Sequence, residues 1–259
     1  MKKYFTALKN SFAEEKYFKF NFYSSFLTIP VKLAVIYYFW FIAMGENTFY
    51  GYDGKMIISY FLAMYLVQIC TSPAMFITFE LFNEINKGTI ISWILKPLSY
   101  PLLVLSKNIA KFIPRFVVTI VIVLVLPFFW NNTVSATIVG GISIVLGYLI
   151  LFELQFLIGS LSLKMKNVLR LRDNIMDILM ILGGVLIPID FMPSILKNLA
   201  FLSPIPYIFY LPAKILAVGA ISQELQSLLI IQMIWGIVLA ILIKVSWKVL
   251  VVDSIKQGG

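Results

Sequence analysis

Residues 79–101 read FELFNEINKGTIISWILKPLSYP and lie between two strongly apolar parts of the chain. The stretch is amphipathic, and it is too polar and too often interrupted to cross a bilayer as one helix. Gly88 breaks it, and Pro97 and Pro101 end it. Such a segment either lies in the membrane interface as an ordinary connector or packs its apolar side on a protein at the membrane surface. We favour the second interpretation, in which a separate motor protein moves the membrane helices through this contact.

The composition is that of a membrane protein. Of the 259 residues, 61% are hydrophobic and 13% are charged, and the mean hydropathy is +0.94. A soluble domain is about 45–50% apolar and about 25% charged. We therefore expect an all-α polytopic membrane protein with a single transmembrane domain over residues 1–259. The net charge of +9 sits mostly beside apolar stretches, so it predicts contact with membrane lipids and no nucleic-acid partner.

Several kinds of chemistry are excluded by residue content. The chain has no histidine, and its single cysteine, Cys70, lies in an apolar stretch. His-based catalysis, most zinc sites and a disulfide framework are therefore ruled out. Gly51–Lys55 reads GYDGK, which is not the P-loop pattern GxxxxGK[ST]. We expect no catalytic site, no metal and no bound cofactor in this chain.

Six apolar stretches are read as membrane spans, of which the fifth is short and contains glycine, and the segments between them differ in character. Residues 1–24 combine lysines with aromatic rings and predict an amphipathic helix at the membrane interface. Residues 190–219 hold four prolines, which predicts short, broken, re-entrant helices in the outer leaflet. Pro73 is expected to kink the second span. The predicted spans are residues 26–44, 56–79, 102–129, 136–163, 174–189 and 225–251, with a cytoplasmic segment at 80–101.

Basic residues indicate the orientation of the chain. They concentrate in residues 1–24, 80–115, 164–173 and 244–259, whereas the loops at 45–55 and 131–135 carry only Lys55. The positive-inside rule therefore places both termini in the cytoplasm of a multi-pass protein of the cell membrane. Lys197 and Lys214 are exceptions, because they lie in the proposed outer region.

Two groups of cations and one carboxylate are candidate functional residues. Three cations repeat every four residues on one helical face, where they bind lipid phosphates, dock a partner or guide an anionic substrate. The other four lie in the most basic short loop. Glu153 lies inside a span, where it either contacts substrate or protons or makes a packing hydrogen bond near Gln155. The cations are Lys107, Lys111 and Arg115 on the face, and Lys164, Lys166, Arg170 and Arg172 in the loop.

The order of these parts resembles the membrane (permease) subunits of ABC-2 type ATP-binding-cassette exporters, including bacterial permeases found with drug-, peptide- or lipid-export ATPases. The resemblance covers nearly the whole chain. It depends on residues 84–101, EINKGTIISWILKPLSYP, and on a proline-rich segment with Pro188, Pro193 and the SPIP of residues 203–206.

The resemblance implies that two permease subunits, identical or related, pair in the membrane and that each meets one ATPase, which binds ATP and Mg²⁺. The substrate would be a hydrophobic or amphipathic drug, peptide or lipid. Its pathway would include Glu153, Gln68, Pro188 and Pro193. The ATPase-coupling residues would be Glu84, Lys87, Gly88, Trp93, Lys96 and Pro97.

Three other functions fit parts of the sequence. A non-transporting scaffold or sensor of a resistance system would share the same span pattern. A secondary transporter would be expected to carry broken helices at corresponding positions of two repeats, whereas this chain has one broken region. A membrane-embedded enzyme is disfavoured because histidine and a carboxylate cluster are both missing.

Overall fold

The computed structural model describes residues 2–17, 19–44, 53–94, 96–126 and 132–256, and within these ranges the chain is helical with no strand. The all-helical prediction is therefore confirmed. The elements are α1 (Lys2–Tyr17), α2 (Lys19–Met44), α3 (Gly54–Thr71), η1 (Ala74–Phe76), α4 (Ile77–Asn86), α5 (Ile90–Ile94), α6 (Tyr100–Val125), α7 (Val134–Ser160), η3 (Leu161–Leu163), α8 (Val168–Leu182), η4 (Ile189–Phe191), α9 (Ser194–Phe201), α10 (Tyr210–Val218) and α11 (Gln223–Lys256).

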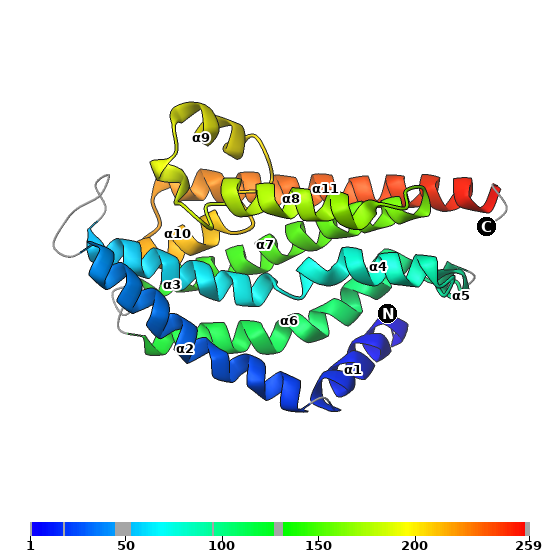
Figure 1. The fold of residues 1–259 in the computed structure, drawn as a ribbon, viewed down its shortest axis with the longest axis horizontal. Helices are drawn as coiled ribbons and strands as arrows, with labels where there is room; N and C mark the ends of the chain where they lie inside the picture. Colours follow the sequence, from blue (N-terminus) through cyan, green and yellow to red (C-terminus); the bar gives the residue numbers. More distant parts are fainter. Residues whose placement is uncertain (1, 18, 45–52, 95, 127–131, 257–259) are drawn as a thin grey trace.

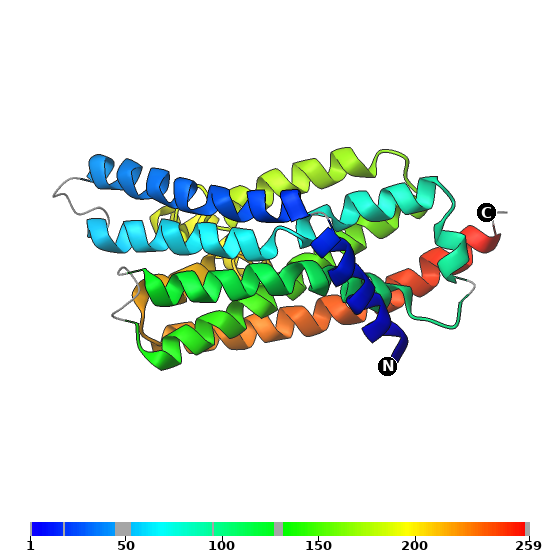
Figure 2. The same ribbon diagram turned by 90° about the horizontal axis from the view of Figure 1, so that it is seen from below.

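The long helices run side by side along the long axis of the molecule. Helices α3, α6, α7, α8 and α11 follow this axis, α2 is inclined to it, and α4 continues the line of α3 (Figure 1). Helices α9 and α10 lie toward one end, whereas α5 and the end of α11 lie toward the other. Helix α1 crosses the bundle obliquely and packs against α6 (Figure 2). We call the end that carries α5 the basic end, because Lys87, Lys96, Lys164 and Lys166 lie there.

Four helices are long and apolar enough to cross a membrane: α3, α6, α7 with its η3 extension, and α11. Leu27–Ala43 in α2 is apolar but shorter. The helix at the predicted fifth span, residues 174–189, begins earlier and ends earlier, at Leu182. It ends there because Gly183 and Gly184 follow, and Gly184 has a φ of 75°. The structure thus describes a multi-pass helical protein with four such helices and one shorter one.

The expected kink at Pro73 is a break between helices. Helix α3 ends at Thr71, a 3₁₀ turn follows, and α4 begins at Ile77. The carbonyl oxygen of Pro73 accepts a 3.2 Å hydrogen bond from Nδ2 of Asn108 in α6. The Asn108 Oδ1 accepts in turn from the Tyr148 hydroxyl in α7, at 2.7 Å. A buried polar pair from two neighbouring helices therefore satisfies the backbone where the proline interrupts it.

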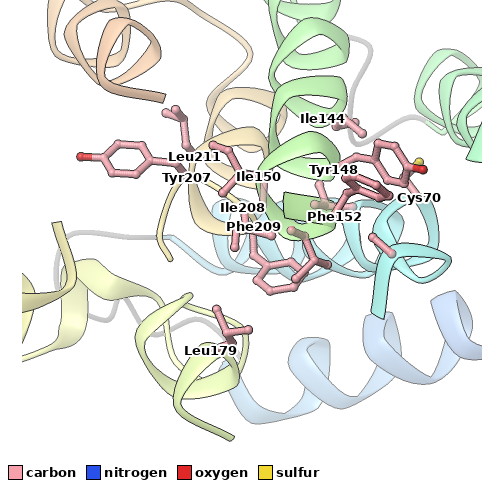
Figure 3. Packing of buried hydrophobic residues seen from close by; sticks show 14 of the residues in the cluster. Cys70, Ile144, Tyr148, Ile150, Phe152, Leu179, Tyr207, Ile208, Phe209 and Leu211 are labelled. Carbon is pink, nitrogen blue, oxygen red and sulfur yellow. The ribbon is translucent and has the colours of Figure 1, made fainter. Parts of the chain in front are cut away.

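The core is organised around α7, which packs against α11, α4 and α10. Figure 3 shows Tyr148 beside Cys70 on one side of α7, and Ile150 near Ile208 on the other. Close approach of the backbones depends on Gly147, since a Cβ there would lie 2.7 Å from the carbonyl oxygen of Ile208. This contact seats the segment before α10 against the middle of α7.

The proline-rich region forms short helices η4, α9 and α10, as its proline density predicts. Asp190 ties them together. Its carboxylate accepts hydrogen bonds from Lys214 Nζ at 3.1 Å and from the Tyr210 hydroxyl at 2.8 Å, and Lys197 Nζ lies 3.4 Å away. One carboxylate thereby joins all three helices.

Candidate functional site

The segment that connects α4 to α6 forms a turn and a short helix at the basic end. Helix α4 ends at Asn86, and Gly88 then takes the left-handed conformation with a φ of 68°. The Thr89 hydroxyl donates to the Glu84 carbonyl at 3.1 Å, and the Ser92 hydroxyl donates to the Thr89 carbonyl at 2.8 Å. Local hydrogen bonds therefore hold the turn from within, and glycine is used where the backbone requires a positive φ.

Glu84 points back toward the bundle. Its Oε2 accepts a 2.8 Å hydrogen bond from the hydroxyl of Tyr100, which is 3% exposed at the start of α6. The Tyr100 ring stacks on Trp247 of α11, with ring centroids 5.0 Å apart. The carboxylate thus joins the segment to α6 and, through the ring, to α11.

The apolar side of α5 packs on the protein itself. Ile90 is 3% exposed, and Trp93 is partly buried against the core. Lys96 and Lys107 place their ammonium groups 3.9 and 4.7 Å from the centroid of the Trp93 ring, within cation–π range. Lys87 and Ile91 remain exposed. The outward face of the segment is therefore small and combines charged and apolar side chains, while most of its apolar side is covered by the rest of the protein.

The N-terminal helix lies against the same region. The hydroxyl of Tyr4 in α1 accepts a 2.9 Å hydrogen bond from the backbone N–H of Ser99, which precedes α6. Helix α1 also packs against α6 itself. A movement of the segment would therefore be transmitted to α1 as well as to the spanning helices.

The predicted row of cations on α6 is divided between two environments. Lys107 belongs to the Trp93 contact, whereas Lys111 forms a 2.6 Å ion pair with Glu80 of α4. Arg115 donates to the Lys111 carbonyl. Of the loop cations, Lys164, Lys166 and Arg170 are exposed. Arg172 donates at 2.8 Å to the Met75 carbonyl and at 2.8 Å to Asp173, so it braces the break between α3 and α4.

The residues expected on a substrate pathway lie on different elements and differ in burial. Gln68 is half-buried in α3, Pro188 is buried before η4, and Pro193 is exposed before α9. Glu153 is half-buried in α7. Its Oε2 is buried and makes no hydrogen bond to any part of the chain that the structure describes. The side chain of Gln155 is hydrogen-bonded to Thr78 and to Met176 and not to Glu153.

Two buried or partly buried polar clusters were not predicted from the sequence. One is the Asp190 cluster described above. The other is Gln232 of α11, which is fully buried and donates to the carbonyls of Ser143 and Tyr207 at 2.9 and 2.7 Å. A single glutamine in the apolar run of residues 228–243 was the available signal, because an isolated polar side chain in a spanning helix usually finds a partner.

These features define a polytopic helical membrane protein with an amphipathic surface segment braced to its spanning helices. Residues 19–255 match the family described as ABC-2 family transporter protein. The chain belongs to this family, so it is the membrane component of an ABC-2 transporter. No curated protein matches the sequence. Membrane subunits of this kind typically lack catalytic sites, and within the described residues no three His, Cys, Asp or Glu side chains are grouped to hold a metal ion.

Proposed function

We propose that the chain is the permease subunit of an ATP-driven exporter that moves a hydrophobic or amphipathic drug, peptide or lipid across the cytoplasmic membrane. A separate ATPase subunit binds ATP and Mg²⁺ and supplies the energy. A second permease subunit, identical or related, completes the pathway. Family membership supports this proposal, because an ABC-2 membrane component implies an ATPase partner in general.

The observation that carries the proposal is the bracing of residues 84–97. A force applied to this segment reaches α6 through the Glu84–Tyr100 hydrogen bond and α1 through Ser99 and Tyr4. Lys87 and Ile91 are exposed for contact with a partner. The coupling residues of the proposal are Glu84, Lys87, Gly88, Trp93, Lys96 and Pro97.

The proposed topology has six spans with both termini in the cytoplasm. The four long apolar helices and the shorter α2 supply five of these crossings. Helix α8, extended by the chain up to Pro188, supplies the remaining one, and η4, α9 and α10 form the re-entrant outer segment. The distribution of lysine and arginine supports this orientation.

Cysteine cross-linking tests the coupling contact. The Cys70 thiol donates to the Thr119 hydroxyl oxygen, so a Cys70→Ser background keeps a donor at this position while removing the native thiol. Lys87→Cys or Trp93→Cys then supplies the only reactive thiol. Because Lys87 is exposed and Trp93 is partly buried, we expect the Lys87→Cys variant to capture a nucleotide-binding protein more efficiently. Lys55→Cys, exposed at the start of α3, is the matched control and should capture none.

A scaffold or sensor is separated from an exporter by the activity of the captured complex. In an exporter, ATP hydrolysis by the partner depends on the permease and falls when the coupling segment is altered. Absence of any nucleotide-binding partner in functional membranes would contradict the proposal. Capture of a partner whose rate of ATP hydrolysis does not depend on this chain would favour the scaffold or sensor.

A further inference from the structure

The outward face of the coupling segment, residues 84–97, carries cations without a carboxylate. The charged side chains of this segment are Glu84, Lys87 and Lys96. Glu84 accepts a 2.8 Å hydrogen bond from the buried Tyr100, so its charge is directed into the bundle. Lys87 and Lys96 are exposed, and neither forms an ion pair with any residue that the structure describes. The charge that the segment presents to a partner is therefore positive.

Trp93 holds two ammonium groups at one place. The Nζ atoms of Lys96 and Lys107 lie 3.9 and 4.7 Å from the centroid of its ring. Each ammonium group is attracted by the ring, but two like charges held at one ring repel each other. Like Lys96, Lys107 has no ion pair within the described ranges of the chain. An anionic group that approaches this ring therefore meets two cations at once and relieves their repulsion.

The segment stands in the aqueous phase, beyond the lipid headgroups. Helix α3 has 18 residues and rises about 27 Å, which is nearly the ~30 Å of a hydrocarbon core. Helix α4 continues its line for 10 residues (Figure 1), which adds about 15 Å. The headgroup region occupies only about 5–8 Å on each side of the core. Lys87, which follows α4, is therefore placed where a protein reaches it more readily than a membrane surface does.

We infer that the coupling segment docks on an acidic protein surface, whose carboxylates meet Lys87 and Lys96 and whose apolar hollow takes Ile91. Ile91 is 54% exposed and lies between the two lysines in the chain. Because the segment directs its own carboxylate inward, the partner supplies the anions. Opposite charges across an interface steer the encounter and fix its register. The inference rests on the proposed function, in which the protein that reaches this segment is the ATPase.

Other partners fit the segment less well. A second copy of this chain that paired through the same face would bring lysines against lysines, and such juxtaposition of like charges is costly. An anionic membrane would match the charge, but the length of α4 carries the segment past the headgroups. An acidic protein surface satisfies both the charge of the segment and its position.

Zero-length cross-linking in native membranes tests the inference. A water-soluble carbodiimide joins an ammonium group to a carboxylate where the two are in contact, and mass spectrometry identifies the new amide bonds. We expect bonds from Lys87 and Lys96 to aspartate or glutamate of the nucleotide-binding protein. A bond between Lys111 and Glu80, which lie 2.6 Å apart, is the internal control for the reaction. The control bond without any bond from Lys87 or Lys96 would overturn the inference.

Charge variants measure the effect on assembly. Lys87→Glu should lower the yield of co-purified ATPase several-fold, because it places a carboxylate against carboxylates. Lys55→Glu is the matched control, since Lys55 is also exposed but lies at the far end of α3. Assembly of the unmodified protein should weaken as the Debye length falls from about 10 Å at 0.1 M salt to about 3 Å at 1 M. Thermal unfolding of both variants shows whether they fold.

The outcomes separate this inference from the proposed function. Capture of the ATPase by Lys87→Cys, together with equal yields from Lys87→Glu and Lys55→Glu, would leave the coupling contact standing and overturn the acidic surface. Failure of Lys87→Cys to capture any nucleotide-binding protein would contradict the proposed function and the inference with it.

A membrane partner is detected with an environment-sensitive fluorophore attached to Lys87→Cys in the Cys70→Ser background. We expect the same emission when the full chain is placed in phosphatidylcholine vesicles and in vesicles that also contain phosphatidylglycerol. A blue shift confined to the anionic vesicles would show that the segment binds lipid headgroups, and this would overturn the inference.

Discussion

The Tyr100 hydroxyl donates a 2.8 Å hydrogen bond to the Glu84 carboxylate, although the two residues stand 16 positions apart, at opposite ends of the segment that connects α4 to α6. The bond closes the segment into a loop whose base is fixed to α6. Because the Tyr100 ring also stacks on Trp247, the base of the loop is tied to α11 as well. In the proposed exporter, this arrangement converts a push on α5 into motion of two spanning helices.

Tyr100→Phe is expected to weaken both the fold and the coupling. The variant keeps the ring stacking but removes the donor to Glu84. A hydrogen bond to a charged group contributes about 1.5–3 kcal/mol, so we expect the free energy of unfolding to fall by about 2 kcal/mol. Thermal unfolding of the purified protein measures this loss. Glu84→Gln, which keeps an acceptor, should lose less; an equal loss in both variants would show that the charge is what matters.

Gly88→Ala tests whether the turn geometry is needed for partner contact. A Cβ at Gly88 meets no atom within 4 Å, so the cost comes only from the φ of 68°. For an L-residue this conformation costs roughly 1–2 kcal/mol, and asparagine tolerates it better than alanine. We expect Gly88→Ala to reduce cross-linking from Lys87→Cys, and Gly88→Asn to retain most of it. Equal yields from the two variants would argue that the turn is not constrained.

Local chemistry made part of this architecture predictable. The break at Pro73 follows from the missing N–H of proline, and the turn at Gly88 follows from the freedom of glycine. Both residues act on the few positions beside them, and their effect is readable along the sequence. Glycine acts in the same local way at the end of α8: Gly183 and Gly184 end the helix at Leu182, although the apolar run continues to Ile189.

Contacts between distant segments were not predictable from one sequence. Gln232 donates to the carbonyl of Tyr207, 25 positions away, and Asp190 accepts from Lys214, 24 positions away and beyond helix α9. Such pairs depend on how helices are placed after folding. Likewise, α6 shows three cations on one face, but only the packing of α4 assigns Lys111 to Glu80.

Gly147→Ala is expected to displace the segment before α10. The added Cβ would lie 2.7 Å from the Ile208 carbonyl oxygen, which is backbone and cannot rotate away. Overpacking of this kind costs typically about 1–3 kcal/mol. Gly236→Ala in α11 is the control, since a Cβ there meets nothing within 4 Å and alanine favours the helix. Thermal unfolding should separate the two variants, and similar melting temperatures would contradict the close approach.

Asp190→Asn is expected to loosen η4, α9 and α10. The side chains of Asp190 and Lys214 are only 16% and 14% exposed, and removing one partner of a buried pair costs about 3–5 kcal/mol. Because both side chains remain partly exposed, we expect the free energy of unfolding to fall by about 3 kcal/mol, the lower end of this range. Lys197→Gln should cost under about 1 kcal/mol, since Lys197 is 38% exposed and its contact is 3.4 Å. Limited proteolysis of residues 190–219 reports the loosening, and equal cleavage of both variants would contradict the central role of Asp190.

Glu153→Leu distinguishes a packing role from a role in transport. The buried Oε2 has no hydrogen-bond partner in the described part of the chain, and leaving a polar atom in that state costs about 1–3 kcal/mol. Replacement by leucine should therefore raise the melting temperature. A residue kept at such a cost within a spanning helix is expected to serve function, so ATP hydrolysis by the complete transporter should fall in the same variant. Glu153→Gln should give a melting temperature and a rate of ATP hydrolysis between those of the unmodified protein and those of Glu153→Leu. If leucine stabilises the fold and hydrolysis is unchanged, Glu153 is not part of the substrate pathway.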